Sequence, residues 1–336
     1  MSITILPFQE NHLLGAANLL AQRHRRDLLA EPALPPQFAD PAVSLKAVEK
    51  TWQQPLASGT VALAHNEVVG YVLGAPKIET KRGRTIWIPL AGHALAPSQD
   101  AELYRDLYAA SAPRWIAEGC FEHYALIPAH DQDALAAWFA LSFGKEHAHG
   151  LREIAPIKEP EHRFDPSIQI RRAERADLEA FMELATIIMR HQADSPVYSP
   201  LLPEEIVGRR QLFERVLTDP EAICWVAEKD GRFLAYQLYT PSEPEVDNLM
   251  DDEKSTYLNI AATREELRGQ GIGQALTAHA LRQAQEQGDT KVGVDWRVTN
   301  LSSSRFWPRQ GFRTIAYRLY RHIDERVAWG HTQAFL

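Results

Sequence analysis

The sequence predicts a mixed α/β protein built from two copies of one unit. Three observations support this. Short runs with strand periodicity alternate with longer amphipathic runs along the 336 residues. That length is large for one core and comfortable for two domains. The order of predicted elements also restarts after a proline-punctuated, charged segment. We therefore expect a first domain at 1–155, a linker at 156–166 and a second domain at 167–336.

In the first half, apolar periodicity alternates between strand and helix and is interrupted by a proline-rich stretch at 31–36. The pattern predicts strands at 3–7, 59–65, 68–73, 85–94 and 123–127, and helices at 11–30, 45–52, 101–118 and 134–141. The two strands at 59–73 are joined by a tight turn, so we expect a hairpin.

The second half repeats this plan. At an offset of 165 residues, the strand at 3–5 aligns with 168–170, and Gly70-Tyr71 aligns with Ala235-Tyr236. At an offset of 169, Asp131, Trp138 and Phe143 align with Asn300, Trp307 and Phe312, a preserved spacing that indicates an internal repeat. Further strands are predicted at 223–228, 233–238, 256–263 and 291–298, and a helix at 272–286.

Composition and charge exclude several function classes. Hydrophobic residues make up 45% and charged residues 24%, as in soluble globular proteins, and no apolar run approaches a membrane span. The net charge of −8 argues against a nucleic-acid binder and fits a cationic substrate. Cys120 and Cys224 are expected to be buried thiols in a reducing compartment. With no signal peptide, we expect a cytoplasmic protein with no membrane partner.

No spacing of cysteine and histidine resembles a zinc site, so we expect no metal. His147 and His149 are interpreted as residues of an exposed loop.

The most informative stretch is Arg268-Gly269-Gln270-Gly271-Ile272-Gly273, between a predicted strand and a predicted helix. This arrangement aims backbone N–H groups and the positive end of a helix dipole at an anion. Glycines let a phosphate approach the backbone, and the arginine adds a positive charge. A dinucleotide fingerprint would need glycine at Gln274, and a Walker loop would need a Gly-Lys-Ser/Thr end, so both are excluded.

This stretch matches Arg/Gln-x-x-Gly-x-Gly/Ala, the pyrophosphate loop of the GNAT superfamily of acyl-CoA-dependent N-acyltransferases. The segment 300–312 matches a second signature, an Asn followed by an aromatic residue and then Gly-Phe. The second half therefore resembles a GNAT domain over about 168–322, and the whole chain resembles the tandem GNAT proteins. The resemblance implies a mainly antiparallel, twisted sheet flanked by helices in each of two tandem GNAT-like domains.

The first half resembles a degenerate copy of the domain. At the offset of 169, Glu102 and Tyr104 replace Gly271 and Gly273. A carboxylate and a bulky phenol would repel and crowd a pyrophosphate, so only the second copy is expected to hold acetyl-CoA.

The resemblance also implies where acetyl-CoA binds. Its pantetheine arm would lie where the fourth and fifth strands of the second domain splay apart. The cofactor-binding residues would be Ile260, Ala261, Ala262, Thr263, Arg268, Gly269, Gln270, Gly271, Ile272, Gly273, Asn300, Ser303, Phe306 and Trp307. Asn300 would bond the cofactor or cap a helix, and Trp307 would pack against the cofactor arm or the core.

The catalytic residues are less clearly indicated. In several members the base is a glutamate near the position of Tyr257, and the acid is often a tyrosine at the position of Trp307, whose indole cannot supply that proton. Asp295, in mid-strand, is equally compatible with catalysis and with an ion pair to Arg297. Tyr257, Asp295 and a water relay therefore stay open as the base.

The predicted function is direct transfer of an acetyl group from acetyl-CoA to a primary amine of a small-molecule or peptide acceptor. The alternative is a non-catalytic acyl-CoA-binding or scaffold protein of the same fold. The chain would act as a monomer, in which the two domains form a pseudo-dimer, or as a homodimer.

Overall fold

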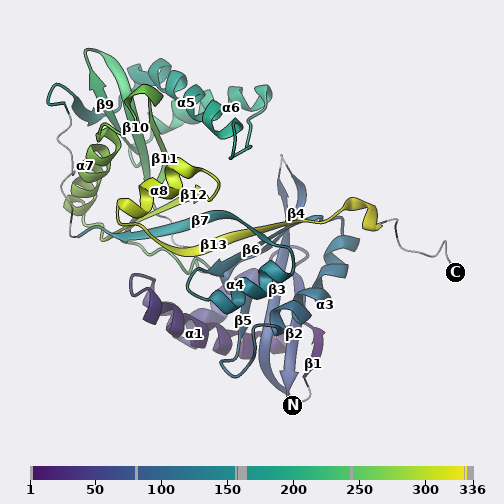
Figure 1. Cartoon of the computed structure of the whole chain (residues 1–336). Helices are drawn as coiled ribbons and strands as arrows, with labels where there is room; N and C mark the ends of the chain where they lie inside the picture. Colours follow the sequence, from purple (N-terminus) through teal and green to yellow (C-terminus); the bar gives the residue numbers. More distant parts are fainter. Residues whose placement is uncertain are drawn as a thin grey trace. The chain divides into compact units, whose positions relative to one another are not determined.

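The computed structural model describes residues 3–79, 82–155, 157, 165–242, 245–328 and 330 (Figure 1). Apart from Ile157, Asp165 and Pro166, the predicted linker at 156–166 lies outside the described residues. The chain packs into two compact units. The first unit comprises 1–148, 244–251 and 315–336, and the second comprises 149–243 and 252–314.

The first unit is a sheet with helices on both faces. Its strands are β1 (Thr4–Pro7), β2 (Ser58–Ala64), β3 (Glu67–Glu79), β4 (Gly83–Ile88), β5 (His93–Leu95), β6 (Glu122–Pro128), the start of β7 (Gly144–Glu153) and most of β13 (Arg313–His322). β1, β2, β3 and β4 pair antiparallel in that order. β4 then pairs with β6 in parallel, and β6 pairs antiparallel with β13.

Four helices enclose the two cores of the first unit. They are α1 (Leu13–Ala30), α2 (Pro41–Trp52), α3 (Leu103–Ala117) and α4 (Gln132–Ala140). Leu103, Leu107 and Trp115 recur at helical spacing and bury one face of α3 in a core shared with Trp138 of α4. Residues of α1 and α2 build the other core.

The second unit repeats the plan. Its strands are β8 (Gln169–Arg172), β9 (Ile223–Lys229), β10 (Arg232–Pro241), β11 (Ser255–Thr263) and β12 (Lys291–Arg297), and its helices are α5 (Leu178–Ala193), α6 (Pro203–Val216), α7 (Ile272–Glu286) and α8 (Leu301–Arg309). β8, β9, β10 and β11 pair antiparallel in that order, and β11 pairs with β12 in parallel. Phe181 of α5 and Phe213 of α6 pack on Tyr236 of β10.

The mixed α/β fold is confirmed, but two local predictions are wrong. The predicted strand at 85–94 is broken by Pro89, and a short helical turn, Leu90–Gly92, separates β4 from β5. His147 and His149 lie half-buried on β7 and not in an exposed loop. Their polar neighbours resemble a loop in sequence, yet this segment alternates across a paired strand.

Among the α-helices and strands of the described residues, α6, β7 and β13 were not predicted from the sequence. Both cysteines are buried and free, in agreement with the sequence. No helix in the described ranges is long and apolar enough to cross a membrane.

Candidate active site

The parallel pairing of β11 and β12 stops part-way along both strands. It runs from Ser255 opposite Lys291 to Leu258 opposite Val294. β11 continues to Thr263 against β10, and β12 continues to Arg297. Beyond Leu258, the edge of β11 that faced β12 is therefore no longer paired with it. The backbone N–H and C=O groups along that edge are open to another partner.

A β-bulge at Asn259 accounts for this divergence. Leu238 of β10 lies opposite Ile260, whereas the next residue, Tyr239, lies opposite Leu258, so Asn259 is the extra residue. Its side-chain amide donates to Thr240 Oγ1 at 2.8 Å and to the Tyr257 carbonyl at 3.1 Å. Since a bulge bends its strand and increases the local twist, it turns β11 away from β12 at this point.

The predicted pantetheine contacts follow the bulge. Ile260 and Ala262 pack in the core beneath α5, whereas Ala261 is exposed although it lies on an interior strand. Thr263 is half-buried, beside the start of α7. Their side chains thus have ordinary packing roles, and any role in binding belongs to the backbone.

The loop at 268–273 has the backbone that its glycines suggested. Gly269 has φ +81° and Gly271 has φ +82°, in the left-handed region that glycine adopts without strain. α7 begins at Ile272, and its N-cap, Gly271, supplies no side-chain cap. Helix geometry leaves the first N–H groups of α7 without acceptors inside the helix. These amides and the helix dipole form an anion-binding end.

The space beside the loop is open at one glycine and tight at another. A Cβ added to Gly269 would meet nothing within 4 Å, whereas one added to Gly273 would meet the ring of Phe306 at 3.3 Å. The residues present therefore fit a pyrophosphate: the loop can be approached, its amides are uncapped, and the exposed residue Arg268 stands beside it, with its Nη1 3.7 Å from Glu265 Oε1.

A buried polar network holds the first turn of α7 against β10. Gln237 Nε2 donates to the Gly273 carbonyl at 3.3 Å and to Thr277 Oγ1 at 2.9 Å, and the Tyr239 hydroxyl donates to Gln237 Oε1 at 2.8 Å. Burial raises the pKa of Tyr239, so its hydroxyl stays a donor. These residues were not predicted from the sequence, although the amide of Gln237 inside the apolar run at 233–238 was an available signal.

The two candidate catalytic residues are in contact. The Tyr257 hydroxyl on β11 donates to Asp295 Oδ1 on β12 at 2.8 Å. Along β12, Val292, Val294 and Trp296 are buried, whereas Asp295 and Arg297 are half-buried. The pair lies beside the last hydrogen-bonded residues of the two strands, where the strands begin to diverge.

Asn300 caps α8. Its Oδ1 accepts from the Ser303 amide at 3.2 Å and lies 3.3 Å from His191 Nε2, at the end of α5. Of the two roles expected for Asn300, the structure therefore shows helix capping. His191 connects the end of α5 to the turn between β12 and α8. Ser303 is half-buried within the first turn of α8.

The two aromatic residues of α8 differ in exposure. Trp307 is buried and packs edge-on against Phe312 with ring centroids 5.5 Å apart. Phe306 is half-buried and lies between Trp307 and Gly273. Trp307 therefore supports the core, while Phe306 faces the loop.

The acetyltransferase (GNAT) family model matches residues 185–312. This range contains the loop at 268–273, the bulge, the diverging strands and the capped α8. Residues 185–312 belong to the GNAT family. No curated protein sequence matches the chain.

Solved structures resemble the GNAT-containing chain over nearly its whole length. A GCN5-related N-acetyltransferase from Sphaerobacter thermophilus has a TM-score of 0.59 at 13% identity, covering 95% of both chains. The fungal multi-domain GH3 β-N-acetylglucosaminidase, described with a GCN5-related glucosamine N-acetyltransferase region, has a TM-score of 0.53 at 16% identity, covering 95% of this chain and 38% of that one. A tandem GNAT protein from the clavulanic acid biosynthesis pathway has a TM-score of 0.47 at 14% identity, covering 95% and 97%. At these identities the first two show the fold alone.

Proposed function

We propose that the chain is an acetyl-CoA-dependent N-acetyltransferase whose active site lies in the second unit. One observation carries the proposal: the bulge at Asn259 opens the ladder between β11 and β12 on the same strand that leads into the uncapped, glycine-lined start of α7. Acetyl-CoA has an extended pantetheine arm with a pyrophosphate at one end. The arm fits the free edge of β11, and the pyrophosphate fits the anion-binding start of α7.

In this proposal, amides at the start of α7 and Arg268 bind the pyrophosphate. The backbone of β11 from Ile260 to Thr263 pairs with the pantetheine arm as a further strand would. A backbone N–H near the bulge stabilises the oxyanion that forms when the amine attacks the thioester carbonyl. The C–S bond then breaks and the CoA thiolate leaves. The chain contributes mainly orientation.

Proton transfer is assigned to Tyr257 and Asp295. The acceptor arrives as an ammonium ion and must lose a proton before it attacks. Asp295 accepts the hydrogen bond from Tyr257, so its carboxylate can take that proton directly or through the tyrosine hydroxyl. The acceptor is proposed to be a primary amine of a small molecule or peptide, without nucleic acid or membrane as partner, in a reducing, cytoplasmic compartment that suits the two buried thiols.

Binding of CoA tests the proposal. Gly271→Glu places a carboxylate at the anion-binding end and forces a side chain into φ +82°, so we expect CoA binding to be lost in calorimetry. Gly288→Glu is the matched control, because Gly288 follows the other end of α7 with φ +94° and open space around it. If both variants are folded and bind CoA equally, the loop is not the site.

The alternative is a non-catalytic acyl-CoA-binding protein of the same fold. The observation that favours it is the buried Trp307, which cannot protonate the leaving thiolate. A thiol-release assay over a panel of amines separates the two functions, because a sensor binds acetyl-CoA without releasing CoA in the presence of any amine.

A further inference from the structure

In the first unit, as between β11 and β12 in the second, the parallel pairing of two neighbouring strands stops and leaves a gap. β4 and β6 pair in parallel from Thr85 opposite Glu122 to Ile88 opposite Ala125, and the pairing then ends. The chain turns at 89–92 and continues as β5 against β3, where Tyr71 lies opposite Ala94. In the second unit Tyr236 lies opposite Ala262 in the same way. The first-unit gap, between β5 and β6, thus corresponds to the site proposed between β11 and β12.

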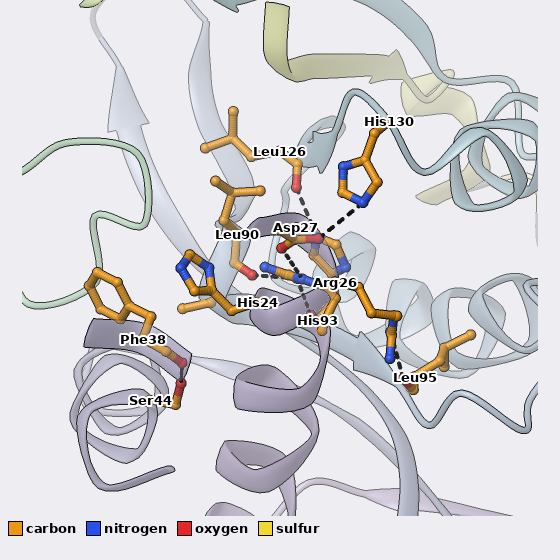
Figure 2. A network of polar contacts seen from close by, with 12 residues as sticks. His24, Arg26, Asp27, Phe38, Ser44, Leu90, His93, Leu95, Leu126 and His130 are labelled. Atoms are coloured by element: carbon orange, nitrogen blue, oxygen red, sulfur yellow. Dashed lines mark hydrogen bonds and ion pairs between the residues drawn. The ribbon is translucent and has the colours of Figure 1, made fainter. Parts of the chain in front are cut away.

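Two side chains close the first-unit gap. His93 Nε2 on β5 donates to the Leu126 carbonyl on β6 at 2.8 Å, which links the two strands. Arg23 reaches in from α1, and its Nη1 donates to the carbonyls of Leu90 at 2.8 Å and His93 at 2.5 Å. Figure 2 shows Leu90, His93 and Leu126 of this cluster near Asp27. Both side chains are buried, with His93 0% and Arg23 2% exposed. The carbonyls of Leu90, His93 and Leu126 at this gap are therefore already bonded within the chain.

The charge of Arg23 is balanced within the same cluster. Asp27, one turn later on α1, accepts from Arg23 Nε at 3.2 Å and lies 3.3 Å from His130 Nε2. The Tyr104 hydroxyl lies 3.3 Å from His93 Nδ1 and can donate to it. Burial lowers the pKa of His93 to about 3, with the charge of Arg23 acting in the same direction, so the ring is neutral. The buried Arg23–Asp27 ion pair is therefore held in place by further bonds to the groups around it.

The phosphate end of the first unit is also closed. The amides of Glu102, Leu103 and Tyr104 donate to Asp100 Oδ1, the Asp100 carbonyl and the Ala101 carbonyl at 2.9, 3.1 and 3.0 Å. The start of α3 thus bonds its own chain, unlike the uncapped start of α7. Tyr104, aligned with Gly273, is 3% exposed and points inward to His93, so its phenol fills the gap and does not crowd a phosphate from outside.

The corresponding positions of the second unit lack this cluster. Ile188 and Gln192 stand 165 residues after Arg23 and Asp27, and both are half-buried. Ala261, at the place of His93, has no polar side chain and is exposed.

We propose that Arg23, Asp27, His93 and Tyr104 form an internal plug that closes the first unit to acyl-CoA, so that each chain takes up one acyl-CoA, in the second unit. This inference rests on the proposed function of the second unit. The plug replaces a ligand with side chains of the chain itself and keeps the diverging strands together.

Native mass spectrometry of the full chain with excess acetyl-CoA tests the count. We expect one acetyl-CoA per chain, none in Gly271→Glu and one in Gly288→Glu. Two acetyl-CoA molecules per chain would contradict the proposed plug but would be compatible with the proposed function. One per chain retained in a folded Gly271→Glu variant would also contradict the plug. None in the unmutated protein would overturn the proposed function and the single site with it.

Hydrogen–deuterium exchange of the unmutated chain locates the ligand without relying on any variant. Acetyl-CoA is expected to slow exchange at 260–263 and 272–274 and to leave 89–95 and 102–105 unchanged. Slowing at 89–95 and 102–105 that equals the slowing at the second-unit segments would overturn the plug.

Discussion

Tyr257 and Asp295, the two residues considered as the catalytic base, are in direct contact. In the sequence they are 38 positions apart and were alternatives for one role. In the structure a hydrogen bond of 2.8 Å joins them at the edge of the strand gap. A carboxylate bonded to a phenol can hold the phenol in place, receive its proton, or both.

Replacing Asp295 by Asn separates these roles. The amide keeps the size of the side chain but cannot accept a proton, so we expect kcat/KM to fall by roughly 10²–10⁴-fold. Tyr257→Phe keeps the ring and the carboxylate, and should cost less if Asp295 takes the proton directly. The readouts are the pH–rate profile and the affinity for CoA, which should change little. An unaltered rate and pH profile in Asp295→Asn would remove Asp295 from the mechanism.

His93 predicts an acid-sensitive first unit. Its pKa falls from 6.5 to about 3 on folding because burial disfavours the imidazolium. Below pH 6.5 His93 is protonated in the unfolded chain but stays neutral in the folded chain. The contribution of His93 to the free energy of unfolding is therefore complete above pH 6.5 and declines as the pH falls toward 3. At two pH units below 6.5 the loss from this group is about 2–3 kcal/mol.

His93→Gln tests this pH dependence, because an amide also donates and accepts but does not titrate. Urea unfolding at pH 7 and pH 5 should show a smaller loss of stability on acidification in the variant than in the unmutated chain. His123, whose pKa burial lowers to about 4, contributes to both proteins and cancels in the difference. Equal losses in the two proteins would contradict the assignment.

Among the strands and helices, the two units differ where a central strand is interrupted. The second unit inserts one residue, Asn259, and remains a strand. The first unit inserts a turn, Leu90–Gly92, and presents the carbonyl of Leu90 to Arg23. The mostly apolar run at 85–94 predicted one continuous strand. That pattern does not show that the buried guanidinium of Arg23 binds the Leu90 carbonyl.

Asn300 begins α8, and its two assigned roles can be separated. Asn300→Ala removes the cap, so we expect about 0.5–2 kcal/mol of lost stability. Asn300→Asp keeps a capping oxygen at the helix start and should retain stability. Its negative charge would weaken CoA binding only if the side chain faces the ligand. Thermal unfolding and CoA calorimetry of both variants give the answer, and unchanged CoA affinity in Asn300→Asp restricts the residue to capping.

At the scale of the whole molecule, the compact units do not follow the chain linearly. Most of β13, from residue 315 on, packs in the first unit, and Ala316 to His322 pair with Pro128 to Glu122 of β6. Leu319 of β13 is fully buried in the first-unit core. The segment 245–251 also belongs to this unit, where Lys50 pairs with Asp247 at 2.9 Å. The linear boundaries at 155 and 167 remain a prediction about the repeat.

A fragment of residues 1–155 tests whether the first unit needs the chain end. Without β13 it exposes the edge of β6 and the core around Leu319, so we expect an aggregating or unfolded fragment. A fusion of residues 1–155 through a Gly/Ser linker to 313–328 should restore a cooperative unfolding transition, and the same fusion with Leu319→Asp should not. A stable, monomeric 1–155 fragment would show that β13 is dispensable.

The α/β class, the repeat and the glycine loop could be predicted from the sequence, because these features depend on local periodicity, on spacing and on the freedom of glycine at positive φ. The sequence also offered helix capping as one of two roles for Asn300, and it placed Asp295 in mid-strand. The sequence did not predict which strands complete the first unit, the contact between Tyr257 and Asp295, or the filling of the first-unit gap by Arg23 and His93. These facts depend on bonds between residues far apart in the chain, whose partners no local pattern specifies.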